Sequence, residues 1–123
     1  MIIRWLPLVA WMGSIFFLSA QPDLPHPSKG WLDWLVSSAA HLLLFAVLAI
    51  LWARALGQGQ RSWLIALALT FLYALSDELH QLFVPGRHAD PLDLAFDAFG
   101  AVSGLAGWGW LQRRISISPK SRS

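Results

Sequence analysis

Four long apolar stretches dominate the chain, at residues 2–20, 35–52, 63–83 and 91–111. An α-helix needs about 20 largely apolar residues to cross the hydrocarbon core of a bilayer. Each stretch is close to that length, and charged side chains inside the stretches are confined to a few positions. The pattern therefore predicts four transmembrane helices.

Turn-forming residues separate the four stretches. Residues 21–27 contain three prolines, residues 57–60 read Gly-Gln-Gly-Gln, and residues 85–87 read Pro-Gly-Arg. Proline lacks a backbone N–H and glycine adopts conformations closed to other residues, so both commonly end helices. We expect an all-α fold, a four-transmembrane-helix bundle with short connections.

The composition agrees with a membrane protein of one domain. Hydrophobic residues make up 56% of the 123 residues and charged residues 13%, against about a quarter charged in soluble domains. A chain of this length has room for a single domain. We expect a transmembrane domain over residues 1–114 and a short basic cytoplasmic tail over residues 115–123.

Composition also excludes several function classes. The chain has no cysteine, which removes disulfide frameworks, thiolate nucleophiles and thiolate zinc sites. The net charge of +2 does not indicate a nucleic-acid partner, because the basic residues lie beside apolar stretches and are not massed on a soluble face.

The basic residues predict the orientation of the chain. In a four-pass topology seven of them fall on one side, namely Arg4, Arg54, Arg61, Arg113, Arg114, Lys120 and Arg122, and only Lys29 and Arg87 fall on the other. Lysine and arginine in short loops mark the cytoplasmic side. Both termini are therefore predicted to be cytoplasmic.

The first stretch has a second interpretation. Arg4 precedes an apolar run that ends in the small residues Ser19 and Ala20, as in a cleaved signal peptide. Cleavage would leave the orientation of the other spans unchanged, because the new N-terminus would already lie outside.

Acidic residues and histidines gather on the opposite, non-cytoplasmic side. The carboxylates are Asp23, Asp33, Asp77, Glu78, Asp90, Asp93 and Asp97, and the histidines are His26, His41, His80 and His88. Acidic residues contribute little to orientation, so the topology does not require this asymmetry. It predicts a site that faces outward.

Helical spacing groups these residues further. Asp77 and Gln81 share a face with Ala66, Thr70 and Ala74, because residues three and four apart are neighbours on a helix. In the fourth stretch Asp90, Asp93, Asp97, Gly100 and Gly104 recur at steps of three and four, and the two glycines form a GxxxG pair that permits close backbone approach.

We therefore predict that the third and fourth helices form an antiparallel hairpin whose polar ends face each other beneath the turn at residues 85–87. Asp77, Glu78 and Asp97 would be neighbours and are the candidate ligands of a divalent cation. Carboxylates at membrane depth are costly unless they are protonated, paired or metal-bound. The cluster is therefore a candidate functional site.

An enzyme could use Asp77 or Glu78 as general base, His80 as proton shuttle and Arg87 as phosphate clamp. A divalent cation held by the carboxylates could bridge to a phosphate. The candidate binding residues are His41, Gln81, Arg87, Asp90, Asp93 and Asp97. No established catalytic motif is matched.

Structural roles compete with each of these assignments. Asp90 before Pro91 is a good helix N-cap, and Asp93 could complete a capping box. His41 could be a packing residue, and Arg87 could pair with a carboxylate or a lipid phosphate. Asp97 could form a buried hydrogen bond across helices.

Because Asp77 and Glu78 are adjacent, we expect that they cannot face inward equally and that one lies at the interface.

The run Ser76-Asp77-Glu78, with His80, Gln81, Phe83, residues 85–87, Asp90, Asp93 and Gly100, resembles the signature of the VanZ-like family, as do Ser19-x-Gln21-Pro22 and His41. The resemblance covers essentially the whole chain. It implies a small bacterial inner-membrane protein, related to a founding member associated with teicoplanin resistance, and no known reaction. Asp97 departs from it, since an amide is expected there.

Three functions are compatible with the residues and the resemblance. The chain could bind or act on a cell-envelope lipid or lipid-linked precursor at the outer face of the membrane. It could be a non-catalytic accessory module for a membrane partner. It could also be a proton-coupled or ion-coupled transporter, which would require a homo-oligomer because four helices enclose little volume.

Overall fold

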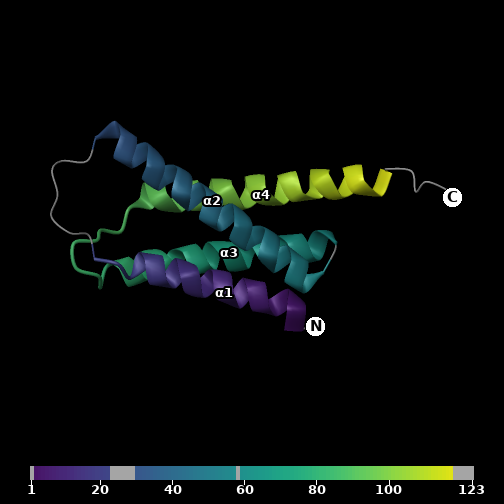
Figure 1. Ribbon diagram of the computed structural model, residues 1–123, viewed down its shortest axis with the longest axis horizontal. Coiled ribbons are helices and arrows are strands. Elements are labelled where there is room, and N and C mark those ends of the chain that lie inside the picture. The colour runs from purple at the N-terminus through teal and green to yellow at the C-terminus, as the bar shows by residue number, and fades with distance from the viewer. Residues whose placement is uncertain (1, 23–29, 58, 118–123) are drawn as a thin grey trace.

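The computed structural model describes residues 2–22, 30–57 and 59–117, which form four α-helices and no strand (Figure 1). The helices are α1 (Ile2–Ser19), α2 (Trp31–Leu56), α3 (Gln60–Gln81) and α4 (Pro91–Ile117). The predicted all-α class is confirmed, and each helix contains most or all of one predicted stretch. Asp23, His26, Lys29, Lys120 and Arg122 lie outside the described residues.

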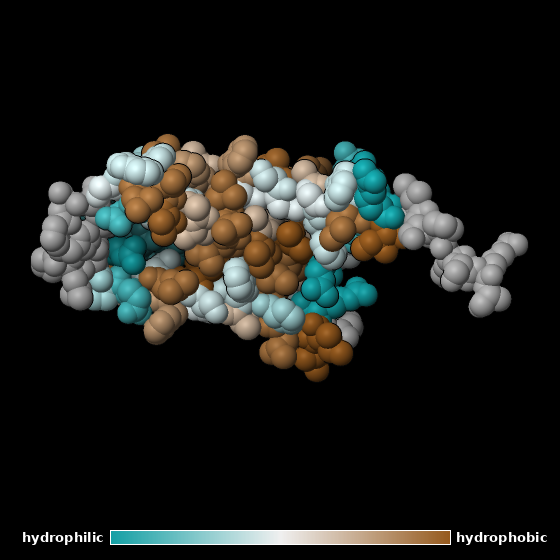
Figure 2. Space-filling view, turned by 45° about the horizontal axis from the view of Figure 1, so that its top comes forward, coloured by the Kyte–Doolittle hydropathy of each residue, from teal (hydrophilic) through white to brown (hydrophobic). Residues whose placement is uncertain are grey.

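The helices α1, α2 and α3 are each long and apolar enough to cross a membrane. Among the described helices α4 does not meet that criterion, because Asp93, Asp97 and four glycines interrupt its apolar residues. Polar residues gather toward both ends of the molecule in Figure 2, and apolar residues cover most of the surface between them. This distribution is that of a membrane protein, whose apolar surface faces lipid.

Two interhelical hydrogen bonds tie α1 to its neighbours. The indole nitrogen of Trp11 donates to the carbonyl oxygen of Leu44 at 2.9 Å, and the hydroxyl of Tyr73 donates to the carbonyl oxygen of Met12 at 2.6 Å. Both bonds lie beside a buried apolar cluster that includes Leu8, Ile15, Phe45, Leu48 and Ala74. The first helix is therefore packed into the bundle through α2 and α3.

The small-residue stripe of α4 packs against α2. A methyl group added at Gly100 would overlap the carbonyl oxygen of Leu42, and one added at Gly104 would lie 2.7 Å from the carbonyl oxygen of Ala46. The sequence suggested that these glycines would serve an α3–α4 hairpin. The helices α3 and α4 are antiparallel and in contact, but the glycines permit the approach of α4 to α2 because they lie on that face.

Glycines with positive φ close the two short connections. Gly57 (φ 103°) ends α2, and its N–H donates to the carbonyl oxygen of Ala53. Gly86 (φ 77°) lies in the α3–α4 connection. These turns occur at the predicted positions and return the chain in opposite directions, so the two connections lie at opposite ends of the bundle.

The end of the bundle at the α3–α4 connection is called the polar end below. The opposite end, where α1 begins, α2 meets α3 and α4 finishes, is called the basic end. All described basic residues except Arg87 belong to the helical turns of the basic end, namely Arg4, Arg54, Arg61, Arg113 and Arg114. The predicted segregation of basic from acidic residues is therefore present in the fold. Because α4 continues to Ile117, it also includes the start of the predicted tail.

Candidate polar site between α2, α3 and α4

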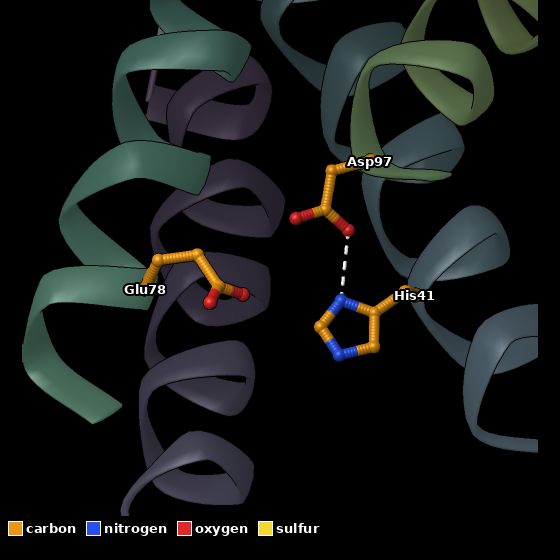
Figure 3. Close-up of side chains that lie close together, drawn as sticks. All are labelled: His41, Glu78 and Asp97. Atoms are coloured by element: carbon orange, nitrogen blue, oxygen red, sulfur yellow. Dashed lines mark hydrogen bonds and ion pairs between the residues drawn. The ribbon is translucent and has the colours of Figure 1, made fainter. Parts of the chain in front are cut away.

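Three helices contribute charged or titratable side chains to the interior of the polar end. His41 comes from α2, Glu78 from α3 and Asp97 from α4, and the side chains converge in Figure 3. Glu78 is 4% exposed and Asp97 is 1% exposed. These three residues and Asp93 are called the polar cluster. Burial of so many carboxylates is unusual, because ionised groups lose hydration when they leave water.

His41 joins α2 to α4 through two carboxylates. Its Nδ1 lies 2.8 Å from Oδ1 of Asp97, and its Nε2 lies 3.9 Å from Oδ2 of Asp93. Asp93 and Asp97 are one helical turn apart, so both can face the same imidazole. The other oxygen of Asp97, Oδ2, is buried without a hydrogen-bond partner among the described residues.

Glu78 faces the same space from α3. Its Oε2 accepts a hydrogen bond from the backbone N–H of Asp90 at 3.0 Å, which fixes the orientation of the carboxylate. Its Oε1 is buried and, like Oδ2 of Asp97, has no hydrogen-bond partner in the described part of the chain. One ligand atom each from His41, Glu78 and Asp97 lies within 4.8 Å of the other two.

Asp77 is buried as well, at 5% exposure, but it is directed to α1, where its carboxylate hydrogen-bonds the side chain of Ser19. The two carboxylates do differ in the neighbours they face, but the expectation that one of them lies at the interface is wrong, because both are buried. The two side chains project about 100° apart on α3, which packs against α1 on one side and against α2 and α4 on the other. Each carboxylate faces a different neighbour.

The predicted seam along α3 is buried, since Ala66, Thr70 and Ala74 are at most 1% exposed and Gln81 is 4% exposed. His80 lies beside this seam. Its ring stacks on Phe16 of α1 with a centroid distance of 4.5 Å, and its Nδ1 is buried without a partner among the described residues. The structure therefore brings His80 to the α1–α3 interface and not into the set formed by His41, Glu78 and Asp97.

Arg87 ties the α3–α4 connection to the end of α1. Its Nε donates to the carbonyl oxygen of Gln21 at 2.9 Å, and its Nη2 lies 3.4 Å from the carbonyl oxygen of Leu18. The last carbonyl groups of a helix lack intrahelical partners and carry partial negative charge, so a guanidinium stabilises them. This capping role was not anticipated from the sequence.

The first turn of α4 has a mixed role. Oδ1 of Asp90 accepts a hydrogen bond from the N–H of Leu92 at 2.9 Å, so Asp90 caps the helix as the sequence suggested. The predicted capping box is not formed, because the N–H of Asp90 donates to Glu78 and leaves Asp93 directed toward His41. Asp93 therefore belongs to the polar cluster as well as to the helix start.

Sequence reasoning included His41 among the binding residues but left it out of the metal candidates. The signal that could have added it is depth, because His41 lies ten residues into α2 and cannot reach the aqueous surface as easily as a terminal residue. Ser19 was also missed as the partner of Asp77. Its position in an otherwise apolar helix end was the available signal.

The polar cluster combines three carboxylates with one imidazole. Two of its buried oxygens lack hydrogen-bond partners within the described ranges, and an unsatisfied buried polar group costs about 1–3 kcal/mol. A proton, a cation or a hydrogen-bond donor from a ligand would relieve that cost. The arrangement can therefore bind a positively charged or hydrogen-bond-donating group from outside the chain.

A family model described as VanZ/LLP1 matches residues 4–112 of the chain. Neither the curated proteins nor the solved structures gave a match. The matched range includes all residues of the polar cluster and the larger part of each helix. The family resemblance seen in the sequence is confirmed.

Proposed function

Because the chain belongs to the VanZ/LLP1 family, we propose that it is a four-span membrane protein whose polar end binds the head group of a cell-envelope lipid or lipid-linked precursor. The observation that carries this proposal is the convergence, beside His41, of two buried carboxylate oxygens, from Glu78 and Asp97, that have no hydrogen-bond partner among the described residues. Ionisable groups inside a membrane protein are expensive to maintain and commonly mark sites of binding or transport.

The position of the cluster favours a lipid head group as the ligand. The polar cluster lies at one end of a bundle that exposes many large apolar side chains, and the face drawn in Figure 2 is largely apolar between its two ends. The cluster is therefore close to the depth at which lipid head groups lie. Hydroxyl and ammonium groups of a head group can donate to the free oxygens of Glu78 and Asp97. A water-soluble substrate would reach a site surrounded by lipid-facing helices less readily than a lipid would.

We further propose that α4 is the fourth span and that the polar end faces the non-cytoplasmic side of the bacterial inner membrane. The 27 residues of α4 extend about 40 Å at about 1.5 Å per residue, which exceeds the hydrocarbon thickness of about 30 Å. Its least apolar face is covered by α2 at Gly100 and Gly104, so lipid does not meet it. The basic end supports the orientation through the positive-inside rule.

The family membership supports a link to glycopeptide sensitivity as part of the same proposal. A protein that binds envelope precursors at the outer face could change how much precursor a glycopeptide such as teicoplanin can reach. This step does not require catalysis, and it is compatible with an accessory role beside a membrane partner.

Thermal unfolding of the purified chain in detergent tests head-group binding. A ligand that binds only the folded state raises the melting temperature as its concentration increases. We expect phosphatidylglycerol or phosphatidylethanolamine to raise it, because their hydroxyl or ammonium groups can donate to the carboxylate oxygens, and triacylglycerol, which has neither a charge nor a hydrogen-bond donor, to leave it unchanged.

Two variants make this test specific. Asp97→Asn removes charge from the polar cluster with little change of shape, and we expect it to abolish the shift. Asp33→Asn makes the same change at an exposed position in the first turn of α2 and should retain it. An equal response to charged and uncharged lipids, or no response to any of them, would contradict the proposed function.

A further inference from the structure

We propose that His41, Glu78 and Asp97 form a binding site for one divalent transition-metal ion. The inference concerns the site of the proposed function. Binding of the ion does not depend on that function, but the use suggested for the ion, the coordination of a lipid phosphate, rests on it.

The spacing of the three side chains suits a metal ion. Their ligand atoms lie within 4.8 Å of one another. Two ligands of a tetrahedral Zn²⁺ ion, each about 2.0–2.2 Å from it, are about 3.3–3.6 Å apart. The set would therefore close on an ion with side-chain movements of about 1 Å, without displacement of the helices.

The unpaired oxygens provide independent support. Oε1 of Glu78 and Oδ2 of Asp97 belong to side chains that are at least nine-tenths buried, and neither has a hydrogen-bond partner in the described part of the chain. The carboxylates of Glu78 and Asp97 both border the space between α2, α3 and α4 in Figure 3. A cation placed there would contact both oxygens and offset the cost of burying them.

Other atoms of these side chains have contacts of the kind that commonly orient the ligands of a metal ion. The backbone N–H of Asp90 donates to Oε2 of Glu78 at 3.0 Å and fixes one oxygen of this carboxylate, while Oε1 stays buried without a partner among the described residues. If Nδ1 of His41 binds the ion, its Nε2–H faces Oδ2 of Asp93, now 3.9 Å away. A carboxylate that accepts the second N–H of a ligating histidine orients the ring and strengthens the ligand.

Asp77 is not part of this ligand set, although the sequence placed it there. Its carboxylate is directed to Ser19 on α1. His41 is the third ligand in place of Asp77. The set of one imidazole and two carboxylates contains both a nitrogen ligand and hard oxygen ligands. This combination matches Zn²⁺ or Mn²⁺ better than Ca²⁺, which takes six to eight oxygen ligands.

Three protein ligands leave at least one coordination position open. A phosphate oxygen of a bound head group could occupy that position, and the ion would neutralise the negative charge of both the phosphate and the carboxylates. This arrangement explains how a cluster rich in carboxylates can bind a phosphate-bearing lipid. The ion would act as the bridge between two groups that otherwise repel each other.

The test is metal binding by the purified full chain in detergent after treatment with a chelator. Mn²⁺ alone is added and followed by electron paramagnetic resonance, and Zn²⁺ alone is followed by calorimetry. We expect about one ion per chain. Glu78→Gln and His41→Gln should each weaken binding at least tenfold, since each removes a ligand or its charge.

Asp77→Asn is the matched control, because it neutralises an adjacent, equally buried carboxylate on the same helix. It should weaken binding much less than Glu78→Gln does, because it removes a nearby negative charge but no ligand atom. The melting temperature of each variant without metal checks that it is folded. Loss of binding in Asp77→Asn as large as in Glu78→Gln would overturn the assigned ligand set. Failure of the unmodified chain to bind either ion would overturn the site itself.

Lipid binding measured in excess chelator separates this inference from the proposed function. If a polyprenyl phosphate still raises the melting temperature there, the head-group site stands and the bridging role of the ion is wrong. If the ion binds and no lipid does, the metal site stands and the proposed function is wrong. We expect the response to the phosphate lipid to require the ion.

Discussion

The two ends of the bundle both contain charged residues, but they bury them differently. At the polar end Asp77, Glu78 and Asp97 are at most 5% exposed, and they lie against partners from other helices. At the basic end the arginines of the described helices are exposed. The difference shows that the polar end holds charged groups inside the bundle, whereas the basic end presents them on its surface.

The surface of the basic end is hollowed. A groove of about 750 Å³ lies between the start of α3 and the end of α4, and is lined by residues that include Trp63, Leu67 and Arg113. A smaller hollow of about 270 Å³ adjoins it beside Arg4 and Arg54. Long arginine side chains on such a surface reach water or lipid phosphates without a fixed geometry. At the opposite end the carboxylates of Asp77, Glu78 and Asp97 are buried and held by packing.

The largest expected difference between the two ends is their accessibility to a reagent that is added outside the cell and cannot cross the membrane. The chain has no cysteine, so a single introduced cysteine reports one position. Phe83→Cys places it in the α3–α4 connection, where Phe83 is 85% exposed, and Gln60→Cys places it at the start of α3. In intact cells a membrane-impermeant maleimide should label the first variant and not the second.

Both variants should be labelled in inverted or permeabilised membranes, which controls for hidden thiols. Labelling of Gln60→Cys and not of Phe83→Cys in intact cells would reverse the proposed orientation. Labelling of both at equal rates in intact cells would contradict a bundle that spans the membrane. Either result would also contradict the proposal that the polar cluster binds lipid head groups of the outer leaflet.

A second prediction concerns the helix pair that positions the polar cluster. Gly100 is three residues from Asp97, and the Leu42 that it contacts is next to His41. Gly100→Ala would force α2 and α4 apart, because the added methyl group meets backbone atoms that cannot rotate away. We expect the free energy of unfolding to fall by about 3 kcal/mol, at the upper end of the usual cost of overpacking.

Gly107→Ala is the control on the same helix, since in the described part of the chain no atom beyond the adjoining helix backbone lies within 4 Å of the methyl group it adds. It should leave stability unchanged or raise it slightly, because alanine favours a helix over glycine. Denaturant titration in detergent measures both variants. Equal stability of the two would show that the approach of α4 to α2 does not determine the fold of the polar end.

A third prediction compares the two partners of the buried pair, with metal removed. His41→Ala leaves Asp97 buried without its hydrogen bond at 2.8 Å, and we expect a loss of about 2–3 kcal/mol, as for other unsatisfied buried groups. Asp97→Asn keeps an oxygen that can accept the hydrogen bond from His41 and removes a buried charge. It should cost less than about 1 kcal/mol or increase stability.

Thermal or denaturant unfolding in a chelating buffer measures both variants. The reverse order, with Asp97→Asn the more damaging, would mean that His41 is positively charged in the folded chain and requires the carboxylate. In that case a proton, and not a metal ion, would compensate the charge of the polar cluster.

Much of the fold could be predicted from the sequence because it depends on local patterns. The apolar stretches predict the helices, and Gly57 and Gly86 lie in the predicted turns with the positive φ that turns require. The segregation of acidic and basic residues also follows directly from their order along the chain. These features need no knowledge of which helix packs against which.

The contacts within the site could not be predicted in the same way. Whether Asp77 or Glu78 faces His41 depends on the side of α3 that α1 covers, which helical spacing alone does not determine. The GxxxG pair of α4 indicated close packing but not its partner, which is α2. The capping of α1 by Arg87 joins residues 66 positions apart in the chain, and no periodicity indicates such a pair.

The smallest expected effect separates the one described arginine near the polar end from those at the basic end. Arg87→Gln removes the donors to the carbonyl oxygens of Leu18 and Gln21, so we expect a loss of about 1 kcal/mol, typical of a hydrogen bond. Arg54→Gln changes an exposed residue in the last turn of α2 and should alter stability by less than about 0.5 kcal/mol.

The two arginine variants are compared by denaturant titration at low and high salt. High salt screens an exposed charge more than a packed one, so the cost of Arg87→Gln should persist at high salt while any effect of Arg54→Gln disappears. If both costs disappear at high salt, Arg87 acts through general attraction to the acidic residues and not through its contacts with α1. The polar end would then differ from the basic end only in the burial of its carboxylates. Arg87, like the arginines of the basic end, would contribute its charge and no specific contact.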